Sequence, residues 1–265
     1  MSIFHAIILG IVEGATEFIP VSSSGHLILA HKMFNIQGIN DLGVDAIFQF
    51  ATILAVLVYF WSDLWHLMMV FIRMCMKKIV ADEDKIMIYA IIVGTIPAVI
   101  FGLFLEKYME TIFRSSQLVA WTLIIGALVM YLAERYAKQN KTLTTNKGFI
   151  IGLFQTLALV PGVSRSGATI SGGLFSGLTR ESATKFSFLL SFPIIVGAGL
   201  KSFLDVYKTG EIATIGSLPL GIGFLVSFFV GLASIHFLIQ YLKTHKLDIF
   251  IWYRVVLAVL IFVFL

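Results

Sequence analysis

Residues 13–26 of this chain read EGATEFIPVSSSGH. The stretch holds two carboxylates four residues apart, three consecutive hydroxyls, a proline, a glycine and a histidine. Apolar runs flank it at residues 7–9 and 27–29. So many polar and ionisable side chains are costly in an apolar setting, and within a membrane they indicate a functional site by default.

The composition shows that the setting is indeed apolar. Of the 265 residues, 58% are hydrophobic and 13% are charged, whereas soluble domains have about 45–50% apolar and about 25% charged residues. We therefore expect an all-α integral membrane protein, with a single membrane domain over residues 1–265. The net charge of +4 is modest and fits Lys and Arg in cytoplasmic loops. The expected partner is the lipid bilayer, and no nucleic acid is expected.

The segments on either side of the motif are too short to cross a membrane. Residues 2–12 and 27–34 are apolar, but a crossing helix needs about 20 residues. Two short arms around a Pro/Ser/Gly centre predict a re-entrant helical hairpin, which survives at membrane depth only when buried in protein or lining a wet cavity. Three spans should follow it, at about 46–62, 86–105 and 117–133. The basic segment from Arg73 to Lys85 is expected to carry a short surface helix, with Trp61 and Trp65 at the interface.

The same order of elements returns in the second half of the chain. Residues 148–160 are short and apolar, and a polar centre, PGVSRSGAT, follows at 161–169. Three more spans are expected, at about 186–203, 218–241 and 250–265. Placing Gly25 on Gly167 aligns the two centres and pairs several of their residues: Ser22 with Ser164, Ser23 with Arg165, Ser24 with Ser166 and Glu13 with Gln155.

The basic segments orient the two halves. Segments 73–85 and 134–147 are rich in Lys and Arg, and segment 106–116 between them holds only Lys107 and Arg114. The positive-inside rule places both basic segments in the cytoplasm. Because each half has three spans, an odd number, we expect two inverted-topology repeats, about 1–135 and 147–265, each a re-entrant hairpin plus three transmembrane helices. Their polar tips would meet near the midplane, as in many transporters.

Two carboxylates of the first motif are candidate metal ligands. Glu13 and Glu17 are four residues apart, so on a helix they share one face. Buried carboxylates repel each other unless a cation lies between them. A divalent metal would satisfy both, and the alternative is a structural pair that caps serine hydroxyls or backbone N–H groups.

The hydroxyls and the histidine of the first motif also allow two interpretations. Serines beside Pro20 commonly cap a helix, but Ser23 could also serve as a nucleophile. His26 follows it by three residues and suits a general base for that hydroxyl, or an acid toward a leaving group. The alternative for His26 is a hydrogen bond between helices.

The second motif suits an anion. A buried Arg165 requires one, either Glu17 in a structural ion pair or a phosphate. Gly162 and Gly167 let backbone N–H groups approach an anion closely. Further donors are the nearby hydroxyls of Ser164, Ser166 and Thr169. This set suits a phosphate or diphosphate better than a carboxylate, because more oxygen atoms must be met.

Together the two motifs resemble those of the bacterial undecaprenyl-diphosphatase family, the bacitracin-resistance type. The resemblance covers the length, the hydropathy, both motifs and their separation, with no departure at the motif positions. It implies a multi-pass enzyme of the bacterial plasma (inner) membrane. Such an enzyme hydrolyses undecaprenyl diphosphate to undecaprenyl phosphate and inorganic phosphate, which recycles the lipid carrier of peptidoglycan and other wall polymers.

The resemblance also implies the features of the site. The site would open to the outer, periplasmic face and use a divalent cation, Mg²⁺ or Ca²⁺, carried with the diphosphate. Matching positions assign the site to two groups of residues: Glu13, Glu17, Ser23, His26 and Arg165 in the chemistry, with Ser22, Ser164 and Thr169 in support. In the expected mechanism Ser23 attacks the terminal phosphorus while His26 takes its proton, or His26 activates water instead.

A polyprenyl-phosphate flippase or transporter is the alternative function. Inverted repeats suit alternating access, whereas pure translocation needs anion binding but no nucleophile. The oligomeric state is left open and includes a homodimer.

Overall fold

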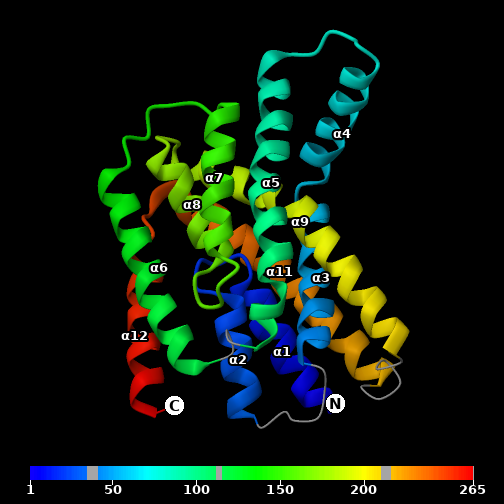
Figure 1. The fold of residues 1–265 in the computed structure, drawn as a ribbon, viewed down its shortest axis with the longest axis vertical. Helices are drawn as coiled ribbons and strands as arrows, with labels where there is room; N and C mark the ends of the chain where they lie inside the picture. Colours follow the sequence, from blue (N-terminus) through cyan, green and yellow to red (C-terminus); the bar gives the residue numbers. More distant parts are fainter. Residues whose placement is uncertain (35–40, 112–114, 210–215, 265) are drawn as a thin grey trace.

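The computed structural model describes residues 1–34, 41–111, 115–209 and 216–264. Within these ranges the chain forms helices and no strands (Figure 1), which confirms the all-α prediction. The helices are α1 (Ile3–Thr16), α2 (Ser23–Met33), α3 (Asp41–Tyr59), α4 (Trp61–Cys75), α5 (Asp82–Thr111), α6 (Ser116–Tyr136), α7 (Thr145–Leu157), α8 (Arg165–Phe175), α9 (Arg180–Thr209), α11 (Ser217–Thr244) and α12 (Asp248–Phe264).

Four of these helices are long and apolar enough to cross a membrane. They lie at Asp82–Leu105 in α5, Ser116–Tyr136 in α6, Arg180–Lys201 in α9 and Ser217–Thr244 in α11. Each of them overlaps one of the expected spans. The last expected span corresponds to α12, an apolar helix of 17 residues.

The first expected span, 46–62, is not one straight helix. The chain bends by 80° between α3 and α4. Phe60 lies at the bend and is buried, with its ring centroid 5.9 Å from that of Phe188. The stacked rings of Trp61 and Trp65 begin α4, which ends at Cys75 before most of the basic segment. The helix in this region therefore lies mostly before the basic segment, at Trp61–Cys75, and not on residues 73–85 as expected.

Two pairs of short helices replace regular spans, as the sequence predicts. Helices α1 and α2 have 14 and 11 residues, and α7 and α8 have 13 and 11 residues. The connection between the helices of each pair, together with the start of the helix that follows it, is termed here a tip: the first tip is residues 17–26 and the second tip is residues 158–169. In Figure 1, α1 and α2 lie below the level of the tips, and α7 and α8 lie above it. The two hairpins therefore approach each other from opposite ends of the molecule.

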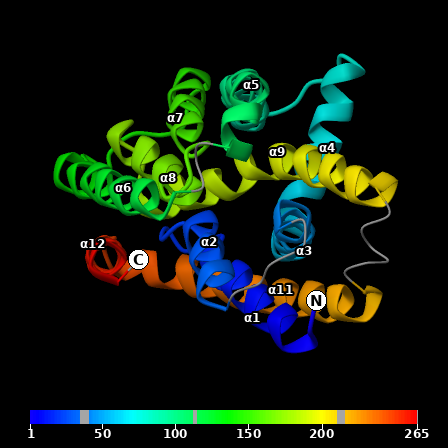
Figure 2. The ribbon, with the colours of Figure 1, turned by 60° about the horizontal axis from the view of Figure 1, so that its bottom comes forward.

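Each hairpin packs against a long helix from the other half of the chain. Helix α1 lies along α11, and α7 lies along α5 (Figure 2). The backbones touch, because a Cβ added at Gly10 would lie 2.5 Å from the carbonyl oxygen of Gly223, and one at Gly152 would lie 2.2 Å from that of Gly94. Small residues allow this close approach between membrane helices. The packing fixes where each tip ends.

Candidate active site

The two tips meet through an ion pair and a backbone contact. The Arg165 Nη2 donates to Glu17 Oε1 at 2.7 Å, and these side chains are 15% and 4% exposed. The amide of Gly162 in the second tip donates to the hydroxyl of Ser22 in the first tip at 3.1 Å. The structure thus brings the two sequence motifs, nearly 150 residues apart, to one point.

The two tips also share a local geometry. Ser22 and Ser164 have left-handed backbones, with φ of 78° and 73°. Each hydroxyl accepts a hydrogen bond from the amide three residues later, at Gly25 and at Gly167, and both distances are 3.2 Å. A left-handed conformation of a residue other than glycine costs of the order of 1–3 kcal/mol and persists where the surroundings hold it, often at functional sites. These serines are the ones that the internal alignment pairs.

The hydroxyl of Ser23 faces a carboxylate. Its Oγ donates to Glu17 Oε2 at 2.5 Å. The other oxygen, Glu17 Oε1, accepts from Arg165 and from Gln49 Nε2, the latter at 3.4 Å. The group placed to take a proton from Ser23 is therefore Glu17, whereas the sequence pattern favours His26 in that role.

His26 has other partners. Its Nδ1 lies 2.7 Å from the carbonyl oxygen of Ser22, and its Nε2 lies 2.7 Å from the hydroxyl of Tyr253. A carbonyl can only accept, so Nδ1 carries the proton and Nε2 accepts from the tyrosine. The two rings also stack, with centroids 5.6 Å apart. In this arrangement His26 orients the first turn of α2 and is not bonded to Ser23.

Several buried polar atoms of the hairpins have no hydrogen-bond partner in the described chain. They are Glu13 Oε1, Arg165 Nη1, both side-chain polar atoms of Gln155 and Ser171 Oγ. Each such atom costs about 1–3 kcal/mol, more if it is charged, and a native group of this kind calls for water, an ion or a ligand. The site therefore offers an anion-binding donor on Arg165 and a cation-binding oxygen on Glu13.

The carboxylates fit a divalent cation only in part. Mg²⁺ is usually held by one or two carboxylates together with substrate phosphates. Glu13 and Glu17 supply such carboxylates, and the first has an oxygen atom free of partners. No group of three or more His, Cys, Asp or Glu side chains that could hold a metal exists in the described residues. A cation here would thus need oxygen ligands from the substrate.

The remaining phosphate-binding candidates are engaged within the protein. The amides of Gly162 and Gly167 already bond serine hydroxyls. The hydroxyl of Thr169 lies 2.5 Å from that of Ser187 and 2.8 Å from the carbonyl oxygen of Arg165. The hydroxyls of Ser164 and Ser166 lie 3.2 Å apart and are buried. These groups shape the second tip, and they could meet a phosphate only by exchanging these bonds.

Sequence reasoning missed the residues that other helices bring to the tips. Arg254 of α12 is fully buried and donates to backbone carbonyls of both tips. Tyr253, Gln49 and Thr122 also contact the tips. One signal was available, because an arginine inside an apolar helix marks a functional position by default. The other three have no such signal.

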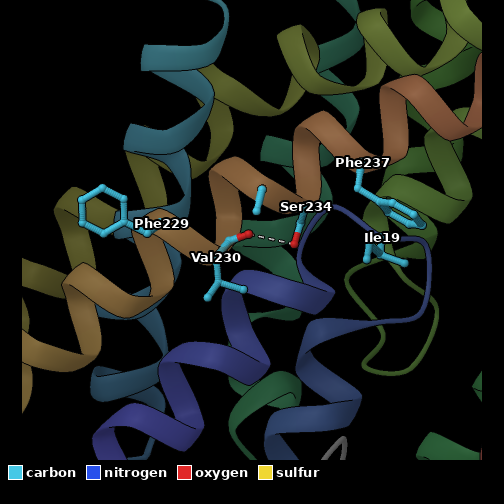
Figure 3. Close-up of a pocket in the computed structure, with 6 residues that line it drawn as sticks. Ile19, Phe229, Val230, Ser234 and Phe237 are labelled. Atoms are coloured by element: carbon cyan, nitrogen blue, oxygen red, sulfur yellow. Dashed lines mark hydrogen bonds between the residues drawn. The ribbon is translucent and has the colours of Figure 1, made fainter.

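An apolar groove of about 400 Å³ begins at the first tip (Figure 3). It is lined by Ile19 of that tip and by residues of α11, namely Phe229, Val230, Ala233, Ser234 and Phe237. The Ser234 hydroxyl donates to the carbonyl oxygen of Val230 at 2.9 Å, so it adds no unsatisfied polar group. Ile19 is two residues from Glu17 in the chain, so the groove and the ion pair share the first tip.

The fold and the site define a class: a multi-pass α-helical membrane protein whose two helical hairpins join at a buried charged centre. Over residues 6–260 the chain matches the family described as bacitracin resistance protein BacA, and it belongs to this family. Similar proteins include the undecaprenyl-diphosphatases of Chloroherpeton thalassium and Myxococcus xanthus. The first is 42% identical to this chain, and the match covers 98% of this chain and 95% of the relative. The second is 39% identical, and the match covers 100% of this chain and 90% of the relative. The family expected from the two motifs is thus confirmed.

Proposed function

We propose that this protein is a membrane phosphatase that hydrolyses undecaprenyl diphosphate to undecaprenyl phosphate and inorganic phosphate. Relatives that align with almost the whole chain are named undecaprenyl-diphosphatase. The observation that carries the proposal for this chain is the Ser23–Glu17–Arg165 cluster, in which a hydroxyl, a carboxylate and a guanidinium from two tips meet. A nucleophile with an adjacent base and an anion-binding cation suits phosphoryl transfer, which depends mainly on positioning and charge stabilisation.

The geometry suggests how the cluster acts. The diphosphate binds with its terminal oxygens toward Arg165 Nη1, the donor that has no partner. Ser23 Oγ forms a bond to the terminal phosphorus and gives its proton to Glu17 Oε2. The bond between that phosphorus and the bridging oxygen breaks, and its electron pair leaves with undecaprenyl phosphate. Water then attacks the phosphoserine, and Ser23 departs with the proton that Glu17 holds, which releases inorganic phosphate.

Glu13 and Glu17 would hold a divalent cation together with the diphosphate. That ion, Mg²⁺ or Ca²⁺, would neutralise charge on the phosphoryl oxygens. The unpartnered Glu13 oxygen supports this assignment. The residues of the second tip from Gly162 to Thr169 would hold Arg165 in place, and they would not be the main phosphate-binding groups.

We further propose that the two halves are inverted repeats. The matched serine caps and the hairpins that approach from opposite ends support this arrangement. With the basic segments 73–85 and 134–147 in the cytoplasm, the first hairpin enters from the outer face of the bacterial inner membrane. The diphosphate would then reach Ser23 from that face, while its prenyl chain lies in the groove beside Ile19.

Phosphate release from undecaprenyl diphosphate by the purified protein tests the activity. We expect release that stops on chelation of divalent cations and resumes when Mg²⁺ is added. Undecaprenyl monophosphate should yield no phosphate, because it lacks the anhydride bond. Folded protein that releases none from the diphosphate but moves the lipid across a liposome membrane would favour the flippase instead.

Rapid quenching tests the covalent step separately. With the terminal phosphate of the substrate labelled, the label should appear on Ser23 before free phosphate accumulates. A control in Ser24→Ala, which removes the hydroxyl of a neighbouring exposed residue, should show the same intermediate. Direct transfer of oxygen from water to phosphate, with no labelled protein at any time, would favour water as the nucleophile.

A further inference from the structure

We propose that Arg254 is a positioning residue that holds the two tips in register across the active site. This inference rests on the proposed phosphatase function. Arg254 lies in α12, far from both motifs in the sequence, and is fully buried. Its guanidinium donates to four backbone carbonyls: Gly162 at 2.8 Å, Leu123 at 3.2 Å, Pro20 at 3.3 Å and Thr122 at 3.4 Å. One side chain therefore bonds the first tip, the second tip and α6 at once.

The absence of a carboxylate partner separates Arg254 from an ordinary structural arginine. In the described chain the hydrogen bonds of Arg254 all go to carbonyl oxygens, whereas Arg165 and Arg180 each pair with a glutamate. A buried charge without a counterion is costly. A planar fork with five donors, however, is suited to reach several fixed acceptors. Arg254 therefore fixes the relative positions of the carbonyl groups that it bonds, and it forms no ion pair among the described residues.

A short chain of contacts leads from Arg254 to the nucleophile. The peptide groups of Gly162 are bonded on both sides, because its N–H donates to Ser22 Oγ and its carbonyl accepts from Arg254. Pro20, two residues before Ser22, is bonded to the same guanidinium. The left-handed backbone of Ser22 then directs Ser23 toward Glu17. Without the guanidinium, Pro20 and Gly162 would lose the hydrogen bonds that hold both tips and thereby orient Ser23.

Gly126 of α6 leaves the space that the guanidinium of Arg254 occupies. A Cβ added at Gly126 would lie 2.1 Å from Arg254 Nη2 and 3.0 Å from the carbonyl oxygen of Val163. Thr122, one turn earlier, donates to the carbonyl oxygen of Pro161 at 2.6 Å. Gly126→Ala therefore displaces the guanidinium without removing it. This offers a second, chemically different way to disturb the same contacts.

The test compares steady-state kinetics of Arg254→Met, Arg254→Lys and Gly126→Ala on undecaprenyl diphosphate. Displacing a reacting group by about 1 Å can cost roughly 100-fold in rate. We expect kcat to fall by about that factor in Arg254→Met and less in Arg254→Lys, which keeps a donor but not the fork. KM should stay within about threefold, because Arg165 and the groove still bind the substrate.

Arg180 provides the matched control. It is a half-buried arginine, and it pairs with Glu134 away from the tips. Arg180→Met should lower the unfolding temperature in detergent and leave kcat unchanged. If Arg254→Met changes kcat only as much as Arg180→Met does, the positioning role is overturned.

A double variant decides whether the two residues act together. In the Arg254→Met background, Gly126→Ala should cost no further kcat, because both changes remove the same contacts. If the two losses multiply, Gly126 does not act through Arg254 and the proposal fails.

If Arg254→Met does not fold, Gly126→Ala and Arg254→Lys replace it in the test. A fall in kcat at an unchanged unfolding temperature supports the proposal, and wild-type kcat overturns it. No release from the folded wild type would overturn the phosphatase itself, whereas release by all variants at the wild-type rate overturns only the positioning.

Discussion

Ser23 and Glu17 share a hydrogen bond of 2.5 Å between the hydroxyl and Oε2. The other oxygen of the same carboxylate bonds Arg165 from the opposite hairpin. Glu17 thus joins the proposed nucleophile to the proposed anion-binding group.

Glu17→Gln should abolish most of the activity. The amide keeps the shape of the carboxylate but cannot take a proton from Ser23, and general-base catalysis typically contributes about 10²–10⁴-fold. We expect kcat for phosphate release to fall within that range. His26→Gln is the comparison, since His26 bonds Ser22 and Tyr253 and should cost less. A larger loss for His26→Gln would restore the histidine as the base.

The ion pair between the tips should also be visible in stability. Arg165→Met leaves Glu17 as a buried charge without its main partner, and breaking a buried pair typically costs about 3–5 kcal/mol. In Glu17→Gln/Arg165→Met neither charge remains, so part of that free energy of unfolding should return. Thermal unfolding in detergent measures the difference. A double variant less stable than Arg165→Met would show that the pair is not the source of the loss.

Glu13→Gln should weaken the response to divalent cations. Removing the charge of the unpartnered oxygen removes a hard ligand that Mg²⁺ prefers. The Mg²⁺ concentration for half-maximal phosphate release should rise by about tenfold or more, in line with the loss of 1.4 kcal/mol or more of binding free energy. An unchanged Mg²⁺ requirement would exclude Glu13 as a ligand.

Filling the groove should affect long substrates selectively. Ala233→Trp places a large ring among the apolar lining beside Ile19. KM for undecaprenyl diphosphate should rise, while KM for a short-chain prenyl diphosphate changes less, because burying each CH₂ contributes about 0.8 kcal/mol. Leu225→Trp, on an exposed part of α11 outside the groove, is the control. Equal effects of the two variants would place the prenyl chain elsewhere.

Hairpin packing can be tested with two glycines. A Cβ at Gly152 would lie 2.2 Å from the backbone oxygen of Gly94, whereas one at Gly221 meets nothing within 4 Å. Gly152→Ala should lower the free energy of unfolding by about 1–3 kcal/mol through overpacking. Gly221→Ala should be neutral or slightly stabilising, since alanine favours the helix. If both variants unfold at the same temperature, the close contact of α5 and α7 is not essential.

The sequence predicted the features that local patterns encode. Apolar runs near 20 residues located the spans, and the Pro/Ser/Gly centres located both tips. The sequence did not predict the bend at Phe60, because no proline or glycine lies near this residue. The bend instead accompanies tertiary packing of Phe60 against Phe188. An apolar run gives no sign of such a bend.

Within the site, residue types were predicted better than their pairings. The sequence placed Glu17, Ser23 and Arg165 in one site, and the structure brings them together. It paired Ser23 with His26 by sequence distance, although the direction of each side chain depends on the left-handed turn at Ser22. Arg254 was missed because its partners are backbone carbonyls of distant segments, which leave no trace in the sequence.

The most direct test of the account uses one residue from each tip. We would measure the rate of phosphate release from undecaprenyl diphosphate by Ser23→Ala, Arg165→Ala and the double variant. If the tips form one active site, each single change should cost about 10³-fold or more, and the double variant should be little worse than the poorer single one, because residues that act as a unit are not additive. Wild-type rates in either single variant, or losses that multiply in the double variant, would contradict a single site built from both tips.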